Sequence, residues 1–292
     1  MSAARRSKSS RGASSKKPSD PDRRVPTGAG PVDRQQPWST RGSRVERIDR
    51  VLVDELTAQV EVRGPESHHL RDVLRVKPGS LVEAFDGKGS IARGEVVAVD
   101  RERVSLALGA AEASSSEAAT ELTLAVALLK GDKLSDVVRP ATELGVSDFV
   151  LFVSTNCEAR ELSAVRLTRL RRVAQEAARQ SGRAVVPTVT GPYIFAEVPL
   201  TGTVLIGDPA AETNFSSFLS TPPADGVQST LSQAEQPGQA TIVTGPEGGF
   251  TDTEVEQLRA RGAIGLRLGP RILRADTAPV AMAAALLLGT EG

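Results

Sequence analysis

Apolar and polar residues in the second half of the chain alternate in a way that is typical of an α/β domain. Short apolar runs that fit strands occur at 122–129, 149–153, 204–206, 241–244 and 266–268. Between them, apolar residues recur at helical spacing in 132–144, 163–180 and 251–261, and a last helix follows Asp276. Because strands that alternate with helices form parallel sheets covered by helices, this pattern predicts an α/β fold with a mostly parallel sheet.

The ends of these helices carry capping residues. Ser163 stands where it caps the second helix, and Thr251 with Glu254 forms the pattern of a capping box. Gly145 and Gly182 follow the first two helices at the position where a glycine ends a helix. These signals place the helix boundaries independently of the apolar spacing.

Residues 44–112 follow a different pattern. Apolar runs at 51–53, 81–85, 91–99 and 103–108 fit short strands with glycine-containing turns between them, and 68–76 fits one or two helical turns. This region is predicted to be a small β-barrel, joined by the Ala-, Ser- and Glu-rich linker 111–120 to a second domain at 120–292. Residues 213–239 are polar and rich in Ser and Pro, which predicts an excursion on the surface.

Residues 1–43 show no periodicity and are predicted to be a disordered basic tail, because they cannot bury enough apolar surface to fold. Residues 1–44 hold eleven Lys and Arg against three Asp and Glu, whereas the rest of the chain holds 25 against 33. Two interpretations stand side by side: an arm that contacts nucleic-acid phosphates, or a tail that aids solubility. An organelle transit peptide ranks behind both.

Composition excludes several classes of protein. With one cysteine, Cys157, and two histidines, His68 and His69, neither an intrachain disulfide nor a Cys- or His-based metal site is expected. The longest apolar stretch, 278–288, is shorter than the roughly 20 residues that span a bilayer, so we expect no membrane segment and a cytoplasmic location. An apolar helix of this kind must be buried on every side, and a second subunit would supply one of those sides.

Two glycine- and proline-containing loops are the strongest candidates for a ligand site. Each of them, 245–249 and 268–274, follows a strand and precedes a helix, the place where open α/β sheets bind ligands. Two ordinary turns are the alternative. No phosphate-binding G-x-x-x-x-G-K-[ST] or strand-linked G-x-G-x-x-G motif is present, which disfavours a P-loop NTPase and an ordinary Rossmann dehydrogenase. Both histidines lie in the first domain, which disfavours a Ser-His-Asp triad.

Segments spread over residues 45–290 resemble the RsmE family of methyltransferases, within the SPOUT superfamily. They are 68–79 with 85–87, 130–133 with 141–146, 180–183 with 186–187, and 245–250 with 268–274, in the order in which the family has them. The resemblance implies an N-terminal PUA-like β-barrel for RNA and a C-terminal α/β domain with a trefoil knot. It also implies a homodimer that methylates N3 of a uridine in 16S rRNA of the small ribosomal subunit with S-adenosyl-L-methionine.

The resemblance also indicates which residues form the site. The cofactor would be held by three loops, with Ile206, Gly207, Gly245, Pro246, Glu247, Gly248, Gly249, Leu268, Gly269, Ile272 and Leu273. From the chemistry of the reaction, our hypothesis is that Arg274 contacts the base or a phosphate and favours the anionic uracil, and that Glu247 or Asp276 accepts the N3 proton or orients the base. For Arg274 the alternative is a cap or an interface ion pair, for Asp276 a helix cap, and for Glu247 a solvated turn.

Candidate RNA contacts are Arg71, Arg75, Lys77 and Lys88 in the barrel, with Lys130 and Lys133 in the second domain. For Lys130 and Lys133 the alternative is a solvated helix start.

Three positions depart from the family pattern. Arg179 stands where the family usually has Glu, and Asp276 shortens a usual Glu by one methylene group. Pro140 lies inside a predicted helix, where it removes one hydrogen bond, so we expect either a bend or a second short helix that starts there. Three rival functions stay open: a non-catalytic rRNA-binding relative, a SPOUT methyltransferase of another RNA, and an α/β enzyme of another adenosine cofactor.

Overall fold

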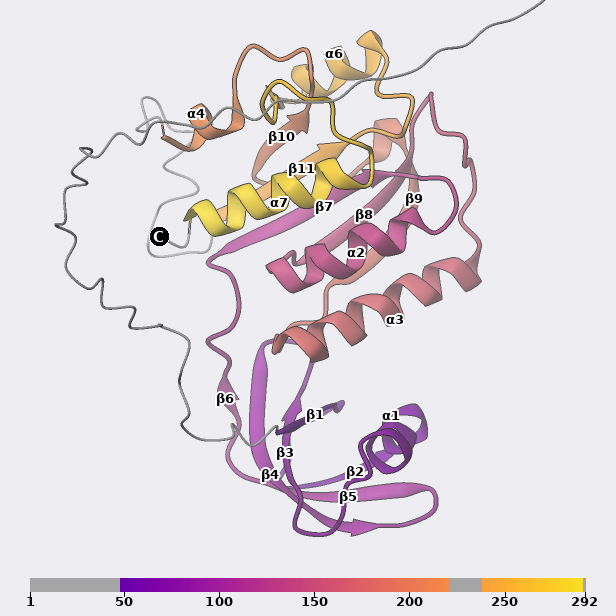
Figure 1. The fold of residues 1–292 in the computed structure, drawn as a ribbon, viewed down its shortest axis with the longest axis vertical. Coiled ribbons are helices and arrows are strands. Elements are labelled where there is room, and N and C mark those ends of the chain that lie inside the picture. Colours follow the sequence, from indigo (N-terminus) through magenta and orange to yellow (C-terminus); the bar gives the residue numbers. More distant parts are fainter. Residues whose placement is uncertain (1–47, 221–237, 291–292) are drawn as a thin grey trace, which may run out of the picture. The chain divides into compact units, whose positions relative to one another are not determined.

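The computed structural model describes residues 48–220 and 238–290 (Figure 1). The basic tail 1–43 lies outside the described residues, as does most of the polar excursion. Within the excursion, α4 (Phe215–Ser220) is a short helix.

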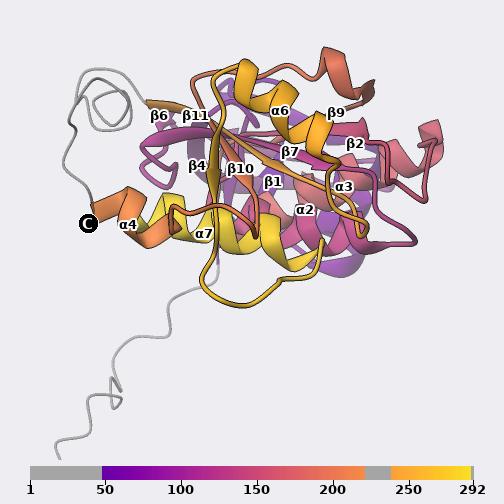
Figure 2. The ribbon, with the colours of Figure 1, turned by 90° about the horizontal axis from the view of Figure 1, so that it is seen from above.

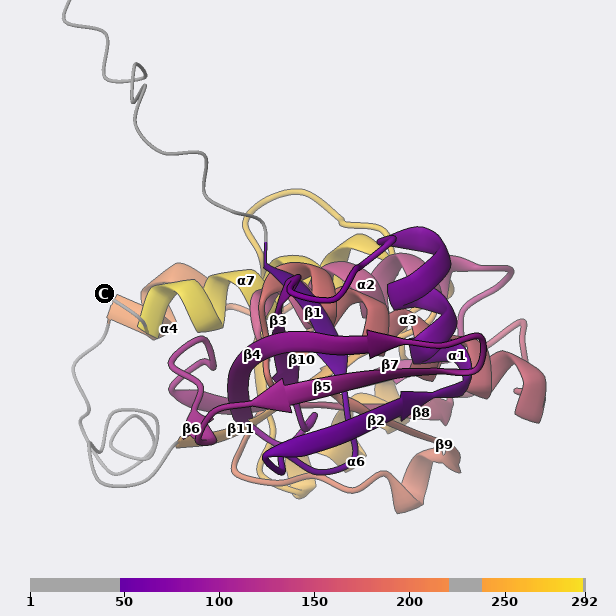
Figure 3. The same ribbon diagram turned by 90° about the horizontal axis from the view of Figure 1, so that it is seen from below.

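The N-terminal domain is a six-stranded sheet that closes over a small core (Figure 3). The strands follow the order β1-β3-β4-β5-β2, with β6 paired to β4, and only β1 and β3 run parallel. Helix α1 (Gly64–His68) continues as a π-helical turn, η1 (His69–Val73), which contributes the buried Leu70 to the core. The strands are β1 (Asp49–Leu52), β2 (Gln59–Arg63), β3 (Leu81–Phe85), β4 (Ser90–Val99), β5 (Arg103–Leu108) and β6 (Glu112–Ala113).

The C-terminal domain is a six-stranded sheet in which every strand pair is parallel, in the order β12-β10-β11-β7-β8-β9. Its two central strands, β11 and β7, are buried along most of their length because helices cover both faces. The strands are β7 (Thr120–Ala127), β8 (Asp148–Val153), β9 (Thr188–Ile194), β10 (Thr203–Gly207), β11 (Gly238–Thr244) and β12 (Ile264–Leu266).

Figure 2 shows α2, α3 and α7 on one side of this sheet and α6 on the other. The caps expected from the sequence are present: the Ser163 hydroxyl accepts a hydrogen bond from the Arg166 amide, and the Thr251–Glu254 capping box is complete. Gly145 and Gly182 end α2 and α3 in the left-handed conformation. The helices are α2 (Lys133–Leu144), α3 (Ala164–Ser181), α6 (Asp252–Ala260) and α7 (Thr277–Thr290), with a 3-10 turn η2 (Phe195–Glu197).

The predicted α/β domain with a mostly parallel sheet, after a smaller domain of short strands, is confirmed. After β12, at one edge of the sheet, the chain returns to the middle, where α7 packs on α2 and on strands β7, β10 and β11. This return brings the segment before α7 beside the ends of strands that lie far from it in sequence.

Several details of the strands differ from the sequence-based expectation. Strands β2 and β9 were not predicted; β9 contains Gly191 and Pro192, which interrupt the apolar pattern but are tolerated at the edge of a sheet. The last strand ends at Leu266, two residues earlier than predicted, because the Arg267 amide donates instead to the carbonyl of Thr213. Helix α2 continues through Pro140 as one helix, which excludes a second short helix that starts there.

One side of α7 is left partly exposed. Within one chain the helix is not buried on every side: Met282, Ala283, Leu286 and Leu287 are buried, but Leu288 is 61% exposed. Residues at 281, 284 and 285 are half-buried and share the outward face with Leu288, at helical spacing. The single chain therefore buries one side of the helix, the side that meets the sheet, and burial of the other side by a second subunit stays a prediction.

Candidate functional site

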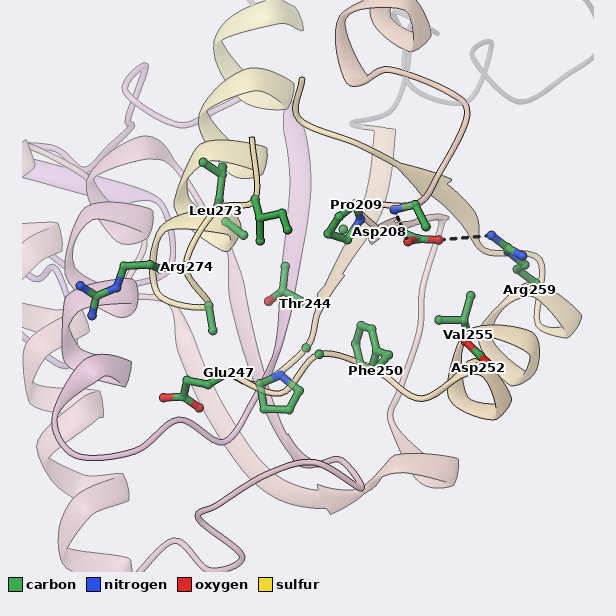
Figure 4. Close-up of a pocket in the computed structure, with 18 of the residues that line it drawn as sticks. Asp208, Pro209, Thr244, Glu247, Phe250, Asp252, Val255, Arg259, Leu273 and Arg274 are labelled. Atoms are coloured by element: carbon green, nitrogen blue, oxygen red, sulfur yellow. Dashed lines mark hydrogen bonds and ion pairs between the residues drawn. The ribbon is translucent and has the colours of Figure 1, made fainter. Parts of the chain in front are cut away.

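A cavity of about 850 Å³ opens where strands β10 and β11 reach their carboxyl ends (Figure 4). Three segments that follow strands line it, and the exposed side of α6 completes the wall. Because parallel strands end at one edge of the sheet, loops that are more than 20 residues apart in sequence meet here. The lining residues are Lys133, 207–210, 244–247, Gly249, Phe250, Asp252, Val255, Glu256, Arg259, 272–275 and Ala278.

The middle of the cavity is apolar. Pro209, Phe250 and Leu273 reach it from three different segments (Figure 4). The Phe250 ring is fixed from behind by Phe152, with ring centroids 6.4 Å apart and the planes nearly parallel. Gly245 lies against this ring, since a Cβ atom there would come within 3.3 Å of it. The wall therefore offers a flat apolar surface beside exposed backbone.

Charged side chains occupy both ends of the cavity, as Figure 4 shows for Glu247 and Arg274 at one end and Asp208 and Arg259 at the other. Asp208 is held in place because one carboxylate oxygen accepts from the Ala210 amide at 2.8 Å and the other from Arg259 at 3.2 Å. A zwitterionic or polar group of a ligand thus finds charged partners at either end.

Glu247 connects the loop at 245–249, called the glycine loop below, to the segment that follows β7. Its Oε1 atom accepts hydrogen bonds from the Lys133 ammonium at 2.5 Å and from the Lys130 amide at 3.2 Å. Burial raises the pKa of Glu247, but the hydrogen bonds from Lys133 and from backbone amides outweigh burial and hold that pKa below its usual value. The carboxylate is therefore ionised at neutral pH and is a weak proton acceptor.

Arg274 lies at the rim of the cavity with its side chain 74% exposed, and its Nε atom is 3.3 Å from the Asp276 carboxylate. Asp276 itself is not part of the cavity wall, and only 17% of its side chain is exposed. The pair therefore presents one exposed cation to a substrate, with Asp276 behind it.

A loop after β8 braces the glycine loop from the far side. The Asn156 amide donates to the carbonyls of Gly248 and Gly249, at 3.3 and 3.1 Å. The buried Glu254 carboxylate accepts from the Ser154 hydroxyl at 3.0 Å and from the Thr155 amide at 2.8 Å. These contacts tie the loop after β8 to the start of α6 and hold the backbone of the glycine loop.

The structure brings most of the predicted cofactor residues into one wall. Among them, Gly207, Gly245, Pro246, Glu247, Gly249, Ile272 and Leu273 line the cavity, together with Arg274. Ile206, Gly248, Leu268 and Gly269 lie outside the wall: Ile206 is fully buried below it, and Gly248 is covered by Asn156.

Sequence reasoning missed Thr244, Asp208, Phe250 and Asn156. For Thr244 and Asp208 a signal existed, because both stand where predicted strands end, beside the loops that were chosen. Phe250 directly follows the glycine loop. Nothing in the sequence indicated Asn156, since its partners lie more than 90 residues away.

Some of the candidate RNA-contacting side chains form ion pairs with carboxylates and others do not. Lys130 pairs with Glu158 at 2.9 Å, Lys133 with Glu247, and Arg71 with Asp72. Arg75, Lys77 and Lys88 are exposed and, among the described residues, form no ion pair. These three are the better placed for phosphates.

The part of the chain that the structure describes contains no cluster of three or more His, Cys, Asp or Glu side chains arranged to hold a metal ion. Within the same residues, no helix combines the length and the apolar character that crossing a membrane requires. Cys157 is 5% exposed and packs in the core, and burial raises the pKa of its thiol.

Comparison with known proteins adds two domain matches. Residues 116–287 match the family model described as an RNA methyltransferase domain, and residues 62–108 match that of an RNA methyltransferase PUA domain.

Whole-chain relatives agree with these matches. The chain is 32% identical to ribosomal RNA small subunit methyltransferase E of a Synechocystis species, over 80% of this chain and 72% of that protein. It is 28% identical to the protein of the same name from Bacillus subtilis, over 84% of this chain and 98% of that protein. The crystal structure of ribosomal RNA small subunit methyltransferase E from Neisseria gonorrhoeae, bound to S-adenosyl methionine, superimposes with a TM-score of 0.69 at 28% identity, covering 82% of this chain and 96% of that one.

Proposed function

Because this chain belongs to the family of ribosomal RNA small subunit methyltransferase E, the RsmE family, we propose that it methylates 16S rRNA. The reaction is the transfer of a methyl group from S-adenosylmethionine to N3 of one uridine of the small ribosomal subunit. The observation that carries this proposal is the cavity formed by three loops at the carboxyl ends of β10, β11 and β12.

The cavity suits S-adenosylmethionine in size and in the distribution of polarity. Its volume of about 850 Å³ lies within the range of ligand pockets, roughly 300–1,000 Å³. The apolar middle, with Phe250 and Leu273, matches a purine, and the charged ends match a ribose and an amino-acid zwitterion. Gly207, Gly245 and Gly249 leave backbone groups open to the ligand.

When bound, S-adenosylmethionine supplies an electrophilic methyl group on a sulfonium sulfur. What the protein must provide is a reactive uridine, because N3 carries a proton at neutral pH and its lone pair is available only once that proton leaves. Arg274, exposed at the rim, places a permanent positive charge where the uracil anion forms and so favours loss of the proton. Asp276 holds the guanidinium in position from behind.

Glu247 orients rather than accepts protons. Its lowered pKa makes it a poor base, whereas its hydrogen bonds to Lys133 and to the Lys130 amide fix the loop that faces the substrate. The N3 proton leaves to solvent, because Asp276 lies behind Arg274 and outside the cavity wall.

We propose further that the barrel contacts RNA phosphates through the exposed Arg75, Lys77 and Lys88, and that Arg71 contributes less because Asp72 neutralises it. Lys130 and Lys133 extend these contacts to the mouth of the cavity. The protein acts as a homodimer in the cytoplasm, where the small subunit is its partner, and the outward face of α7 supplies the subunit interface.

The first test is calorimetric titration of the full chain with S-adenosylmethionine, with NADH as the control ligand. We expect micromolar binding of S-adenosylmethionine alone. Small subunits and free 16S rRNA from cells that lack the endogenous activity are then incubated with the protein and labelled cofactor. Methylation at N3 blocks the pairing edge of the base, so reverse transcription must stop at a single position in 16S rRNA.

The outcomes separate the rival functions. Cofactor binding without methyl transfer to any RNA would indicate a non-catalytic relative. Methyl transfer only to an RNA other than 16S rRNA would support the methyltransferase activity and contradict the proposed substrate. Binding of NADH instead would contradict the proposed cofactor.

A further inference from the structure

Thr244, the last residue of β11, carries a polar group that the protein itself leaves without a partner. The side chain is buried, with 2% of the residue exposed, and its hydroxyl oxygen makes no hydrogen bond in the structure. A buried hydroxyl without a partner is destabilising, because it has lost its hydrogen bonds to water and gained none in return. Such a group calls for an explanation.

The surroundings fix where this hydroxyl points. A Cβ atom on Gly207 would lie 3.6 Å from the Thr244 methyl group and 3.0 Å from the Met282 sulfur. The methyl group therefore faces Gly207, and the hydroxyl occupies another position on the same Cβ atom. Figure 4 shows Thr244 in the middle of the cavity, with its oxygen on the side of Leu273 and Arg274 rather than of Asp208.

We infer that the Thr244 hydroxyl is a specificity-determining contact for the nucleoside half of S-adenosylmethionine, and that its hydrogen bond is completed only when the cofactor is bound. This inference rests on the proposed function. The nucleoside is the chosen half because Thr244 lies in the apolar middle of the cavity, with Pro209, Phe250 and Leu273 around it. A purine with ring nitrogens and an amino group fits that environment, whereas the charged amino-acid end fits the charged rim.

Thr244→Val is the variant that tests this inference, since valine keeps the shape and removes only the hydroxyl. We expect affinity for S-adenosylmethionine to fall about five- to tenfold in calorimetry, the size of one lost hydrogen bond. Without cofactor, the same variant should melt at an equal or a higher temperature, by up to about 4 °C, because an unsatisfied buried group is gone. Weaker binding together with undiminished stability is the signature of a group reserved for a ligand.

Two control variants keep the result interpretable. Thr241→Val makes the same change on the same strand, but the Thr241 hydroxyl donates to the Thr201 carbonyl at 2.8 Å and accepts from the Thr201 amide at 3.0 Å. This control should melt at a lower temperature and bind the cofactor normally. Thr244→Ser keeps the hydroxyl and loses the methyl group, so it should bind within about twofold of wild type while melting lower.

Which half of the cofactor Thr244 contacts is tested with 5′-methylthioadenosine, which has the nucleoside but lacks the amino-acid end. A similar loss of affinity for this ligand in Thr244→Val supports the nucleoside contact, and equal binding by both proteins would overturn it. If wild type binds S-adenosylmethionine and Thr244→Val binds it equally well, the inference fails and the proposed function stands. If wild type does not bind it, the proposed function fails first.

Discussion

At the scale of single residues, the site consists of side chains that are held by others rather than free. Glu247 is held by Lys133, Asp208 by Arg259, and Arg274 by Asp276. The partners of these residues determine their roles. A carboxylate whose pKa is lowered by a lysine is suited to fixing a loop, whereas an exposed guanidinium is suited to meeting a substrate.

Removal of Arg274 should slow catalysis more than it weakens cofactor binding. In Arg274→Ala we expect kcat to fall about 10²- to 10³-fold, the usual loss when one group that stabilises a developing anion is removed. In Asp276→Asn we expect kcat to fall about tenfold. Combining the two changes should lower kcat no further than Arg274→Ala alone, because Asp276 acts through Arg274. The measurement is single-turnover methylation of 16S rRNA. Full turnover by Arg274→Ala, or an additive double variant, would contradict these roles.

At the scale of elements, the Glu254 carboxylate joins two loops to one helix. Its Oε1 atom accepts from Ser154 and Thr155, and its Oε2 atom completes the capping box at Thr251. Burial raises the pKa of Glu254, but these hydrogen bonds outweigh burial and leave that pKa below its usual value. The ionised form is therefore the stabilising one.

Glu254→Gln should lower the free energy of unfolding at pH 7 by about 1–3 kcal/mol, because a neutral amide cannot accept all of these bonds. Since the folded-state pKa of this acid is depressed, its stabilisation is present above the unfolded-state pKa and is lost as pH falls through the folded-state value. The difference between wild type and variant should therefore shrink between about pH 5 and pH 3. Denaturant titrations across this range measure it, with the exposed Glu143→Gln as control; a difference that does not depend on pH would argue against the ionised form.

At the scale of the whole molecule, α7 is an apolar helix that one chain buries on one side only. Its inward face is buried against the sheet, while its outward face, at 281, 284, 285 and 288, is apolar and partly exposed. Ile272, in the neighbouring cavity loop, is 83% exposed. A partner that covered α7 would therefore lie close to the cofactor cavity.

Ala284→Glu should convert a dimer into a monomer, since it places a charge in the middle of this apolar face. Light scattering after gel filtration should give wild type twice the 30.7 kDa chain mass and the variant a single chain mass. Val165→Glu, at an exposed apolar position on α3, should remain dimeric. A dimeric Ala284→Glu would place the interface elsewhere, and a monomeric wild type would reject the homodimer.

Much of the fold could be predicted because the signals for it are local. Apolar spacing and capping residues such as Ser163, Thr251 and Gly182 report on their own neighbourhood, and the structure follows them. The missed strand β9 shows the limit, since Gly191 and Pro192 break the local pattern. Gly191 is needed there because a Cβ atom would meet the Leu151 carbonyl oxygen at 2.2 Å, a contact from 40 residues away.

The sequence by itself determined most of the strands, the main helices, their order and the two loops that carry glycine and proline, because each of these depends on residues a few positions apart. Only the tertiary structure decided which residues face the cavity. It buried Ile206, covered Gly248 with Asn156 and left the Thr244 hydroxyl without a partner. These outcomes depend on parallel strands ending side by side and on the chain returning past them before α7, and no local pattern records that arrangement.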